Sequence, residues 1–353
     1  MNTYIRRIAL ASMALLALSA PIVGIRGTSY AAGSNSLGVN PRRDYTIQSG
    51  QTKSDTLTVT NLSKTDDLTV GIDLIDFSAK NETGAPSLIL DSSKETRWSL
   101  KPYAKFPKSV NVPAGKSVQI PFSITIPKNL GAGSYYGAVR YTSGGTADNS
   151  KNLSLTSSTA TLVFVRVPGE ANDALRILTF GAFTPNADAS SGTFGKMYVG
   201  SAPKYLAYRI VNTGNVAEQP NGSVELKNIF SKKVKIFDKA NPNGNIVLID
   251  QTRRFDLCLN ESTVTAKDPR NNTDTTTPVC NPLKLAPGRY TARLALVYGD
   301  NGSSQHELSY VSSFWYLPTW FIIVVVVVIL FLIALGWLIK RAFAGKRYAN
   351  KRR

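Results

Sequence analysis

Histidine, cysteine and acidic residues are scarce in this chain of 353 residues. It has one histidine, two cysteines and 23 acidic residues against 41 lysines and arginines. A Ser/His/Asp or Cys/His hydrolase needs an imidazole that can be oriented and recycled during the reaction. His306 is the only histidine, and it stands in a polar run without a Gly-x-Ser-x-Gly nucleophile elbow. We therefore interpret His306 as a surface residue and expect no hydrolase of this class.

Metal and nucleotide sites also lack their usual ligands. A structural zinc site wants four ligands, which two cysteines and one distant histidine do not supply. The acidic pairs Asp66 with Asp67 and Asp73 with Asp76 are candidates for acid/base work or calcium binding, but neither has the spacing of a calcium loop. We interpret them as solvated acids in turns. Because no P-loop or dinucleotide fingerprint occurs either, we predict no enzyme, no cofactor and no metal.

The N-terminus has the composition of an export signal. Arg6 and Arg7 precede an apolar run over 8–25, small residues follow up to Ala32, and no acid occurs in this stretch. This order of basic, apolar and small segments predicts a signal peptide over 1–32. The alternative is a retained N-terminal anchor, since the apolar run is somewhat long.

The C-terminus carries a second apolar run, which has no charge over 320–339. A helix of twenty residues that rises about 1.5 Å per residue is roughly 30 Å long, which matches the hydrocarbon core of a bilayer. Trp320 and Trp337 stand near the two ends of the run, where headgroups accommodate aromatic rings. We predict a transmembrane helix over 318–339, anchored by these tryptophans and by Lys340 and Arg341.

Much of the positive charge lies at the two ends of the chain. Three basic residues fall in the signal and seven in the tail 340–353, with no acid in either. The positive-inside rule places the tail in the cytoplasm and the large N-terminal part outside the plasma membrane. Attraction to anionic inner-leaflet lipid explains the tail, so we predict no nucleic-acid partner. The remaining excess is interpreted as a solvated surface, with binding to anionic wall polymers or headgroups as the alternative.

Between the two ends, apolar residues recur at every second position, which is the period of a strand with one buried face. In the clearest run, 117–126, the alternating apolar residues are Val118, Ile120, Phe122, Ile124 and Ile126. Pro121 cannot donate a ladder hydrogen bond, so we expect this strand to lie at a sheet edge or to bulge there. Short strands with frequent turns between them predict β-sandwiches rather than a parallel sheet.

A break in the strand pattern at 168–173 predicts two domains, 37–168 and 174–312. The two halves contain similar motifs: Asn61-Leu62-Ser63 matches Asn212-Thr213-Gly214, and Gly133-Ser134-Tyr135-Tyr136 matches Gly288-Arg289-Tyr290. Convergent turn chemistry is the alternative to a relationship between the halves. The predicted fold is all-β, with two immunoglobulin-like β-sandwich domains in tandem and one C-terminal transmembrane α-helix.

Cys258 and Cys280 both lie in the part predicted to face an oxidising space, so we expect a disulfide between them. Two polar stretches, 142–158 and 260–277, are predicted to be loops, the second of them enclosed by the cysteines. Trp98 is either an exposed platform for sugar stacking or an anchor in the core, and we favour the core.

Several motifs of the first half resemble those of a known family: Gly38-Val39-Asn40-Pro41-Arg42, Val112-Pro113-Ala114-Gly115-Lys116-Ser117 and the segment 131–138. They are similar to the first domain of bacterial WxL-protein-interacting surface proteins and of related two-domain immunoglobulin-like membrane-anchored proteins. The segments 211–215 and 287–290 are similar to the partner domain of that architecture. The resemblance implies an extracellular, immunoglobulin-like surface protein, with peptidoglycan or partner-protein binding proposed for the WxL branch.

We therefore expect a single-pass bacterial surface protein that acts as a structural, adhesive or scaffold module. Its expected partners are the lipid bilayer and a surface protein or a wall polymer such as peptidoglycan. Strand addition at an exposed sheet edge is the mechanism we favour, near 142–158 or near the strand that contains Pro121. The alternatives are a carbohydrate-binding or wall-modifying protein and an accessory subunit of an envelope assembly. No motif identifies the ligand or the oligomeric state.

Overall fold

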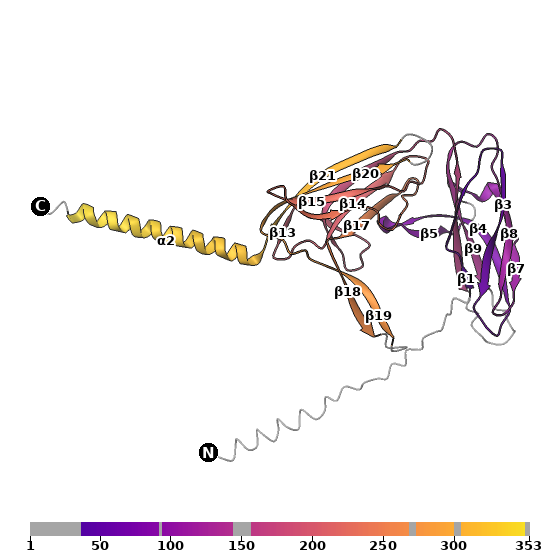
Figure 1. Ribbon diagram of the computed structural model, residues 1–353, viewed down its shortest axis with the longest axis horizontal. Helices are drawn as coiled ribbons and strands as arrows, with labels where there is room; N and C mark the ends of the chain where they lie inside the picture. Colours follow the sequence, from indigo (N-terminus) through magenta and orange to yellow (C-terminus); the bar gives the residue numbers. More distant parts are fainter. Residues whose placement is uncertain (1–36, 92–93, 144–156, 268–272, 300–304, 350–353) are drawn as a thin grey trace, which may run out of the picture. The chain divides into compact units, whose positions relative to one another are not determined.

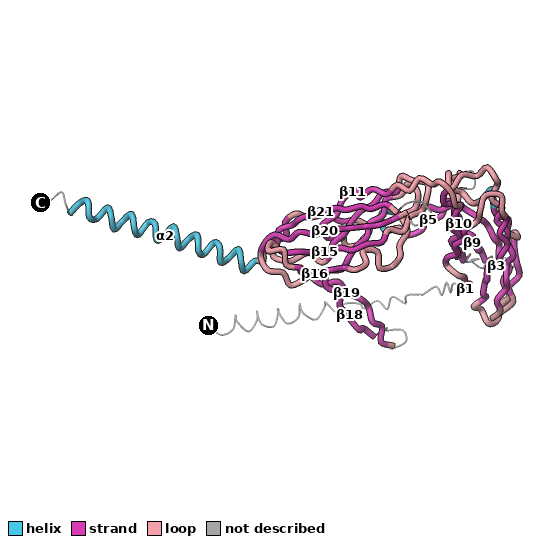
Figure 2. Tube along the Cα trace, turned by 45° about the horizontal axis from the view of Figure 1, so that its top comes forward, coloured by secondary structure: helices cyan, strands magenta, loops and turns pink. Residues whose placement is uncertain are grey.

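The computed structural model describes residues 37–91, 94–143, 157–267, 273–299 and 305–349. Nearly all of its regular structure is β-strand, and one helix, α2 (Thr319–Ala349), ends the described chain (Figures 1 and 2). The predicted signal peptide, 1–32, lies outside the described residues, as does most of the predicted loop 142–158.

Two sheets form what we call the N-terminal sheet pair. The first sheet has the order β1 (Leu37–Val39), β3 (Thr52–Asn61), β8 (Ser117–Thr125) and β6 (Ala104–Lys105). The second has the order β2 (Arg42–Thr46), β10 (Ser157–Val167), β9 (Gly133–Ser143), β4 (Leu68–Lys80) and β5 (Ala85–Ile89), with β7 (Ser109–Val112) also on β4. Two 3-10 turns, Asn81–Thr83 and Lys101–Tyr103, lie in the connections.

The core of this pair is built from the alternating residues of both sheets. Leu57 and Val59 of β3 and Ile120 of β8 are buried from one side, and Val139 of β9 and Val163 of β10 from the other. The two sheets therefore bury one shared apolar layer, as a β-sandwich does. The strand predicted over 117–126 is confirmed within one residue, since β8 covers Ser117–Thr125. Its apolar residues face the core and its polar residues lie on the outer face, as the period of two predicts.

Residues 175–317 form a second set, which we call the C-terminal sheet pair. One sheet has the order β12 (Gly192–Phe194), β11 (Leu175–Pro185), β14 (Tyr205–Asn212) and β17 (Thr252–Cys258). The other has the order β13 (Met197–Val199), β21 (His306–Leu317), β20 (Gly288–Tyr298), β15 (Asn221–Asn228) and β16 (Lys233–Phe237). In the described residues, no strand of one sheet pair joins a sheet of the other.

The two sheet pairs repeat one topology. In each, the first strands divide between the two sheets: β1 and β11 pair with β3 and β14, while β2 and β13 run parallel to the last strands, β10 and β21. Each pair also has a tyrosine corner, in which a Tyr hydroxyl near the start of a strand donates to a carbonyl four residues upstream. Tyr135 donates to Gly131 O at 3.0 Å, and Tyr290 donates to Ala286 O at 2.8 Å. This is an immunoglobulin-like arrangement.

A buried asparagine ends the equivalent strands β3 and β14. The Nδ2 of Asn61 donates to Asp66 O and Val112 O, and the Nδ2 of Asn212 donates to Val216 O and Val247 O. In both, Oδ1 accepts the main-chain N–H two residues later. The similarity of the two asparagine motifs, predicted from the sequence, therefore reflects equivalent positions in the fold.

One loop prediction is wrong. The stretch 260–277 forms most of a hairpin, β18 (Asn260–Lys267) with β19 (Asp274–Asn281), in place of a loop. Nearly all of its residues are exposed on both faces, so no apolar alternation marks it. Its β-branched threonines and valines nevertheless favour an extended backbone. A disulfide joins Cys258, at the end of β17, to Cys280 in β19 and so ties the base of the hairpin to the sandwich.

Candidate functional site

The two sheet pairs meet across a shared apolar cluster. Trp98 stacks on Tyr136 with ring centroids 5.5 Å apart, and Leu248 and Ile249 of the C-terminal sheet pair pack in the same cluster. The Trp98 side chain is only 8% exposed. A ring that stacks on a sugar must present a free face, so the platform interpretation of Trp98 is wrong and the core interpretation is confirmed.

Polar contacts surround this cluster. Arg97 forms a bidentate pair with Asp250, at 2.7 and 2.6 Å, and also donates to Gly214 O. Arg209 forms a second bidentate pair with Glu82. A bidentate arginine–carboxylate pair of this kind fixes the relative orientation of its two side chains and also attracts them electrostatically. Arg97 and Asp250 are each about half exposed, so their ion pair adds little to the free energy of unfolding. Its main effect is to fix how the two sheet pairs are oriented at their contact.

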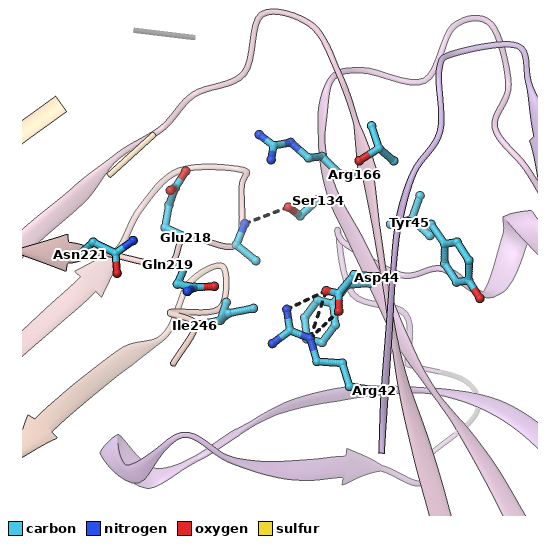
Figure 3. Close-up of a pocket in the computed structure, with 13 residues that line it drawn as sticks. Arg42, Asp44, Tyr45, Ser134, Arg166, Glu218, Gln219, Asn221 and Ile246 are labelled. Atoms are coloured by element: carbon cyan, nitrogen blue, oxygen red, sulfur yellow. Dashed lines mark hydrogen bonds and ion pairs between the residues drawn. The ribbon is translucent and has the colours of Figure 1, made fainter. Parts of the chain in front are cut away.

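Beside the cluster lies a polar cleft of about 340 Å³, which both sheet pairs line (Figure 3). Arg42 and Asp44 come from β2, Arg166 from β10, and Glu218 and Asn221 from the C-terminal sheet pair. The Arg42 guanidinium donates to both carboxylate oxygens of Asp44 and lies 4.8 Å from the centroid of the Phe164 ring. Arg42 is therefore already neutralised and held in place.

Glu218 is the chemically unusual residue of the cleft. Its side chain is 2% exposed, accepts the Gly299 N–H at 3.2 Å and hydrogen-bonds the side chain of Asp173. Burial, and then the hydrogen bond and charge of Asp173, raise the pKa of Glu218 to about 8, although Gly299 N–H and Arg166 act in the opposite direction. Glu218 is thus mostly protonated at neutral pH. The junction between the sheet pairs thus holds a buried, protonated carboxyl group.

A second candidate site is the free side of β8. The bonds Asn61 N to Lys116 O and Ile126 N to Gln51 O fix which residues of β8 face β3. Since facing and non-facing residues alternate in an antiparallel ladder, the main-chain groups of Gln119 and Pro121 point away from β3. On that side, β6 covers only Ser123 and Ile124. The prediction that Pro121 lies at an edge is therefore confirmed: its missing N–H falls on the open side.

An open groove of about 640 Å³ adjoins this edge. Phe106 stacks on Phe122 at 5.0 Å and, with Pro107 and Pro121, supplies its apolar lining, while Lys105 and Asp55 supply charge. The Tyr45 hydroxyl donates to Asp55 at 2.9 Å, and burial followed by that carboxylate raises the pKa of Tyr45 to about 12. The groove therefore combines an apolar lining with one basic and one acidic side chain, beside the open side of β8.

The other candidate residues from the sequence have structural roles. His306 stacks on Tyr298 at the end of β21 that is distant from α2. Asp66 accepts from Ser63 and Thr65 within a turn, and Asp67 accepts from Ala114 N. In the described residues, no cluster of three or more His, Cys, Asp or Glu side chains is arranged to hold a metal.

The interpretation of Asp73 and Asp76 as solvated turn acids is wrong. Both lie in strand β4. Asp73 pairs with Arg140 at 2.9 Å, while Asp76 is fully buried and accepts from Thr96 and Ser99. Asp76 thereby fastens to β4 the segment that contains Trp98. The available signal was an acid within an apolar strand, because a buried carboxylate needs such partners.

The predicted anchor residues all lie in α2, whose segment Thr319–Arg341 is long and apolar enough to cross a membrane. Trp320 and Trp337 are exposed, and the guanidinium of Arg341 lies 5.3 Å from the centroid of the Trp337 ring. Lys340 directly precedes Arg341 and is exposed as well. The structure thus unites these four residues on one helix, separate from the cleft and the groove.

Comparison with known proteins does not place the chain in a family. No family model and no curated protein matches it. It is similar to the class 5 fimbriae chaperone CfaA, with 14% identity, a TM-score of 0.36 and coverage of 78% of this chain and 98% of that one. It is similar also to the SafB chaperone in complex with Salmonella enterica SafA pilin, with 11% identity, a TM-score of 0.35 and coverage of 78% of this chain and 96% of that one. The E. coli chaperone DraB is similar with 14% identity, a TM-score of 0.32 and coverage of 77% of this chain and 95% of that one. These likenesses assign no function to this chain.

Sequence reasoning missed the residues that join the sheet pairs, among them Arg97, Asp250, Asp173 and Glu218. Each lies outside the strands, where no periodicity predicts burial or a partner. The nearest signal was the short run Val216-Ala217-Glu218, in which an acid follows two apolar residues. Only the docking of the two sheet pairs reveals its role.

Proposed function

We propose that the protein is a non-enzymatic surface protein, built from two tandem immunoglobulin-like domains, 37–168 and 174–312, on one membrane span. The repeated topology, with a tyrosine corner and a buried strand-end asparagine in each half, supports the two domains. The apolar helix α2 supports the anchor. The basic tail after the helix supports an orientation with the strands outside and the tail in the cytoplasm.

The activity we propose is the binding of a partner protein by strand addition at β8. The observation on which this rests is the open side of β8, where, within the described residues, no main-chain hydrogen bond is made by the N–H and C=O of Gln119 or by the C=O of Pro121. Strand addition obtains affinity from such main-chain groups and specificity from adjacent side-chain pockets. The groove lined by Phe106 and Phe122 is the adjacent pocket.

Pro121 sets the length of the strand that binds. Edge prolines discourage indiscriminate pairing because they remove one main-chain donor. A partner strand therefore pairs with the Ser117–Gln119 part of β8 and turns its next residues into the groove beside Pro121. An apolar residue there, followed by a basic one toward Asp55, matches the lining of the groove.

The test is cross-linking of the full chain in its native membrane. A photoreactive amino acid replaces Lys105, which is exposed and lines the groove. We expect a defined protein adduct that persists in Gln119→Ala and is lost in Gln119→Pro, because only proline removes the outward N–H. Equal cross-linking of both variants would refute strand addition.

A wall polymer is the competing partner class in this test. Isolated sacculi are incubated with the full chain in detergent, and the bound fraction is compared between the same two variants. Retention that does not depend on residue 119 would assign binding to the polymer and remove the β8 edge from the mechanism. A protein adduct without retention supports the proposal.

A further inference from the structure

Apolar side chains are exposed at one end of the C-terminal sheet pair. Phe230 is 82% exposed and Ile229 60%, both in the turn between β15 and β16. Met197 and Val199 of β13 and Trp315 of β21 are exposed as well. Several exposed apolar side chains at one end of a sheet are typical of a surface that another molecule or a membrane covers.

The strand register places these residues at the same end of their sheet. Asn228, the last residue of β15, lies opposite Tyr290, which lies opposite Phe314. The turn 229–232 continues beyond Asn228, to the level of Tyr316 and the end of β21. β13 is the edge strand next to β21, and its Met197 pairs with Trp315, so β13 lies at this same end of the sheet.

This end of the sheet is also where the chain enters the membrane helix. β21 ends at Leu317 and α2 begins at Thr319, so only Pro318 separates them. Two residues span about 7 Å at most, and the turn lies two strand spacings, about 10 Å, from β21. The connection therefore keeps the turn 229–232 within about 17 Å of the start of α2, close enough for the turn to reach the headgroup layer.

The turn is rigid and basic. Oδ1 of Asn228 accepts the N–H groups of Phe230 at 3.0 Å and Lys232 at 2.9 Å, which holds the turn in shape and leaves the two apolar side chains outside. Four lysines flank the tip, at positions 227, 232, 233 and 235, against the single acid Glu225, which pairs with two of them. A surface with apolar residues and cations matches an anionic lipid headgroup layer.

We propose that the turn 229–232, together with Met197, Val199 and Trp315, inserts into the headgroup layer of the leaflet beside the strands, with its lysines on anionic lipid. This contact holds the C-terminal sheet pair in one orientation on the bilayer. The inference rests on the membrane anchor proposed above. It adds a second contact with the lipid, which the anchor by itself does not require.

The test uses the full chain in lipid vesicles. Because the described chain has no free cysteine, an environment-sensitive fluorophore is attached at Phe230→Cys. Asp238→Cys, exposed just beyond the opposite end of β16, is the matched control, and Val327→Cys in α2 reports insertion of the span. Vesicles contain phosphatidylcholine with or without phosphatidylglycerol, and carry nitroxide lipids that quench at the headgroup or deep in the chains.

We expect headgroup nitroxides to quench the label at 230 but not at 238, and deep nitroxides to quench the label at 327. Charge reversal by Lys232→Glu and Lys233→Glu lowers the quenching at 230 about threefold or more in anionic vesicles. Equal quenching at 230 and 238, with 327 quenched, overturns the inference and leaves the anchor intact. Absence of quenching at 327 overturns the anchor, and the inference with it.

Discussion

Replacement of Glu218 by Gln should make the protein more stable at alkaline pH and leave its stability at acidic pH nearly unchanged. Glu218 is buried against Asp173, and its pKa is raised from the ordinary value of 4.5 to about 8. A glutamine retains an acceptor for Gly299 N–H and supplies a permanent donor to Asp173. It therefore imitates the protonated form of Glu218 and cannot ionise.

The magnitude follows from the raised pKa. Below pH 4.5 the carboxyl group is protonated in both folded and unfolded chains, so its full contribution to stability is present there. As the pH rises toward 8, the unfolded chain releases its proton while the folded chain retains it, and stability is lost. The contribution of Glu218 to the free energy of unfolding of the wild type falls by up to about 1.4 kcal/mol per pH unit in this window, and by about 3.5 kcal/mol in total between pH 5 and pH 8. The Glu218→Gln variant lacks this loss.

The assay is urea unfolding of the full chain in detergent at several values between pH 5 and pH 8, followed by tryptophan fluorescence, to which Trp98 at the junction contributes. Glu225→Gln is the control, because Glu225 is partly exposed and its lysine partners Lys227 and Lys233 lower the pKa of its carboxyl group. The contribution of Glu225 is present above its unfolded pKa and is lost only as the pH falls below that value. The control variant should therefore leave the slope between pH 5 and pH 8 unchanged.

Two results would refute this reasoning. If the difference in unfolding free energy between Glu218→Gln and the wild type does not grow with pH, Glu218 is ionised in the folded chain and the buried carboxyl pair holds no proton. If Glu218→Gln is less stable than the wild type at pH 8, the carboxylate makes a favourable contact that outweighs its burial.

Three further predictions concern stability. The double change Cys258→Ser and Cys280→Ser should lower the free energy of unfolding by about 3 kcal/mol in the chain-entropy model, and a reductant should then have no additional effect in denaturant titrations. Trp98→Ala should cost about 3–5 kcal/mol in the same titrations, since it opens a cavity in the cluster between the sheet pairs; a loss below 1 kcal/mol would show that the cluster is not packed. Asn61→Ala and Asn212→Ala should each cost about 2 kcal/mol or more because each leaves buried carbonyl groups without donors, and unequal costs would argue against equivalent roles.

Several features of the fold followed from local patterns. The period-two run around Ile120 marked β8, and the proline within it marked the open side of that strand. The matching asparagine motifs at Asn61 and Asn212 marked equivalent strand ends. These predictions held because burial of one strand face and the missing N–H of proline act through the strand itself, whatever its neighbours are.

Other features escaped sequence reasoning because they depend on distant partners. The sequence predicted that Asp76 is a solvated acid, but in the fold it is buried and accepts hydrogen bonds from Thr96 and Ser99. The hairpin β18–β19 carried no apolar alternation, since its residues are exposed on both faces. The pairing of Glu218 with Asp173 joins a loop to the segment between the two sheet pairs, and no pattern along the chain connects the two residues.

The apolar run at the C-terminus, the alternation of the strands and the presence of just two cysteines determined by themselves a β-rich protein with a C-terminal helix apolar enough to cross a membrane and a disulfide. Each depends only on the solvent preference of neighbouring side chains or on the chemistry of a single residue type. The tertiary structure alone decided that Trp98 is buried, that Gln119 faces an open edge, and that Phe230 lies at the same end of its sheet as the start of α2. Those outcomes depend on which strands pair and in what register, and pairing energy comes from residues far apart in the chain.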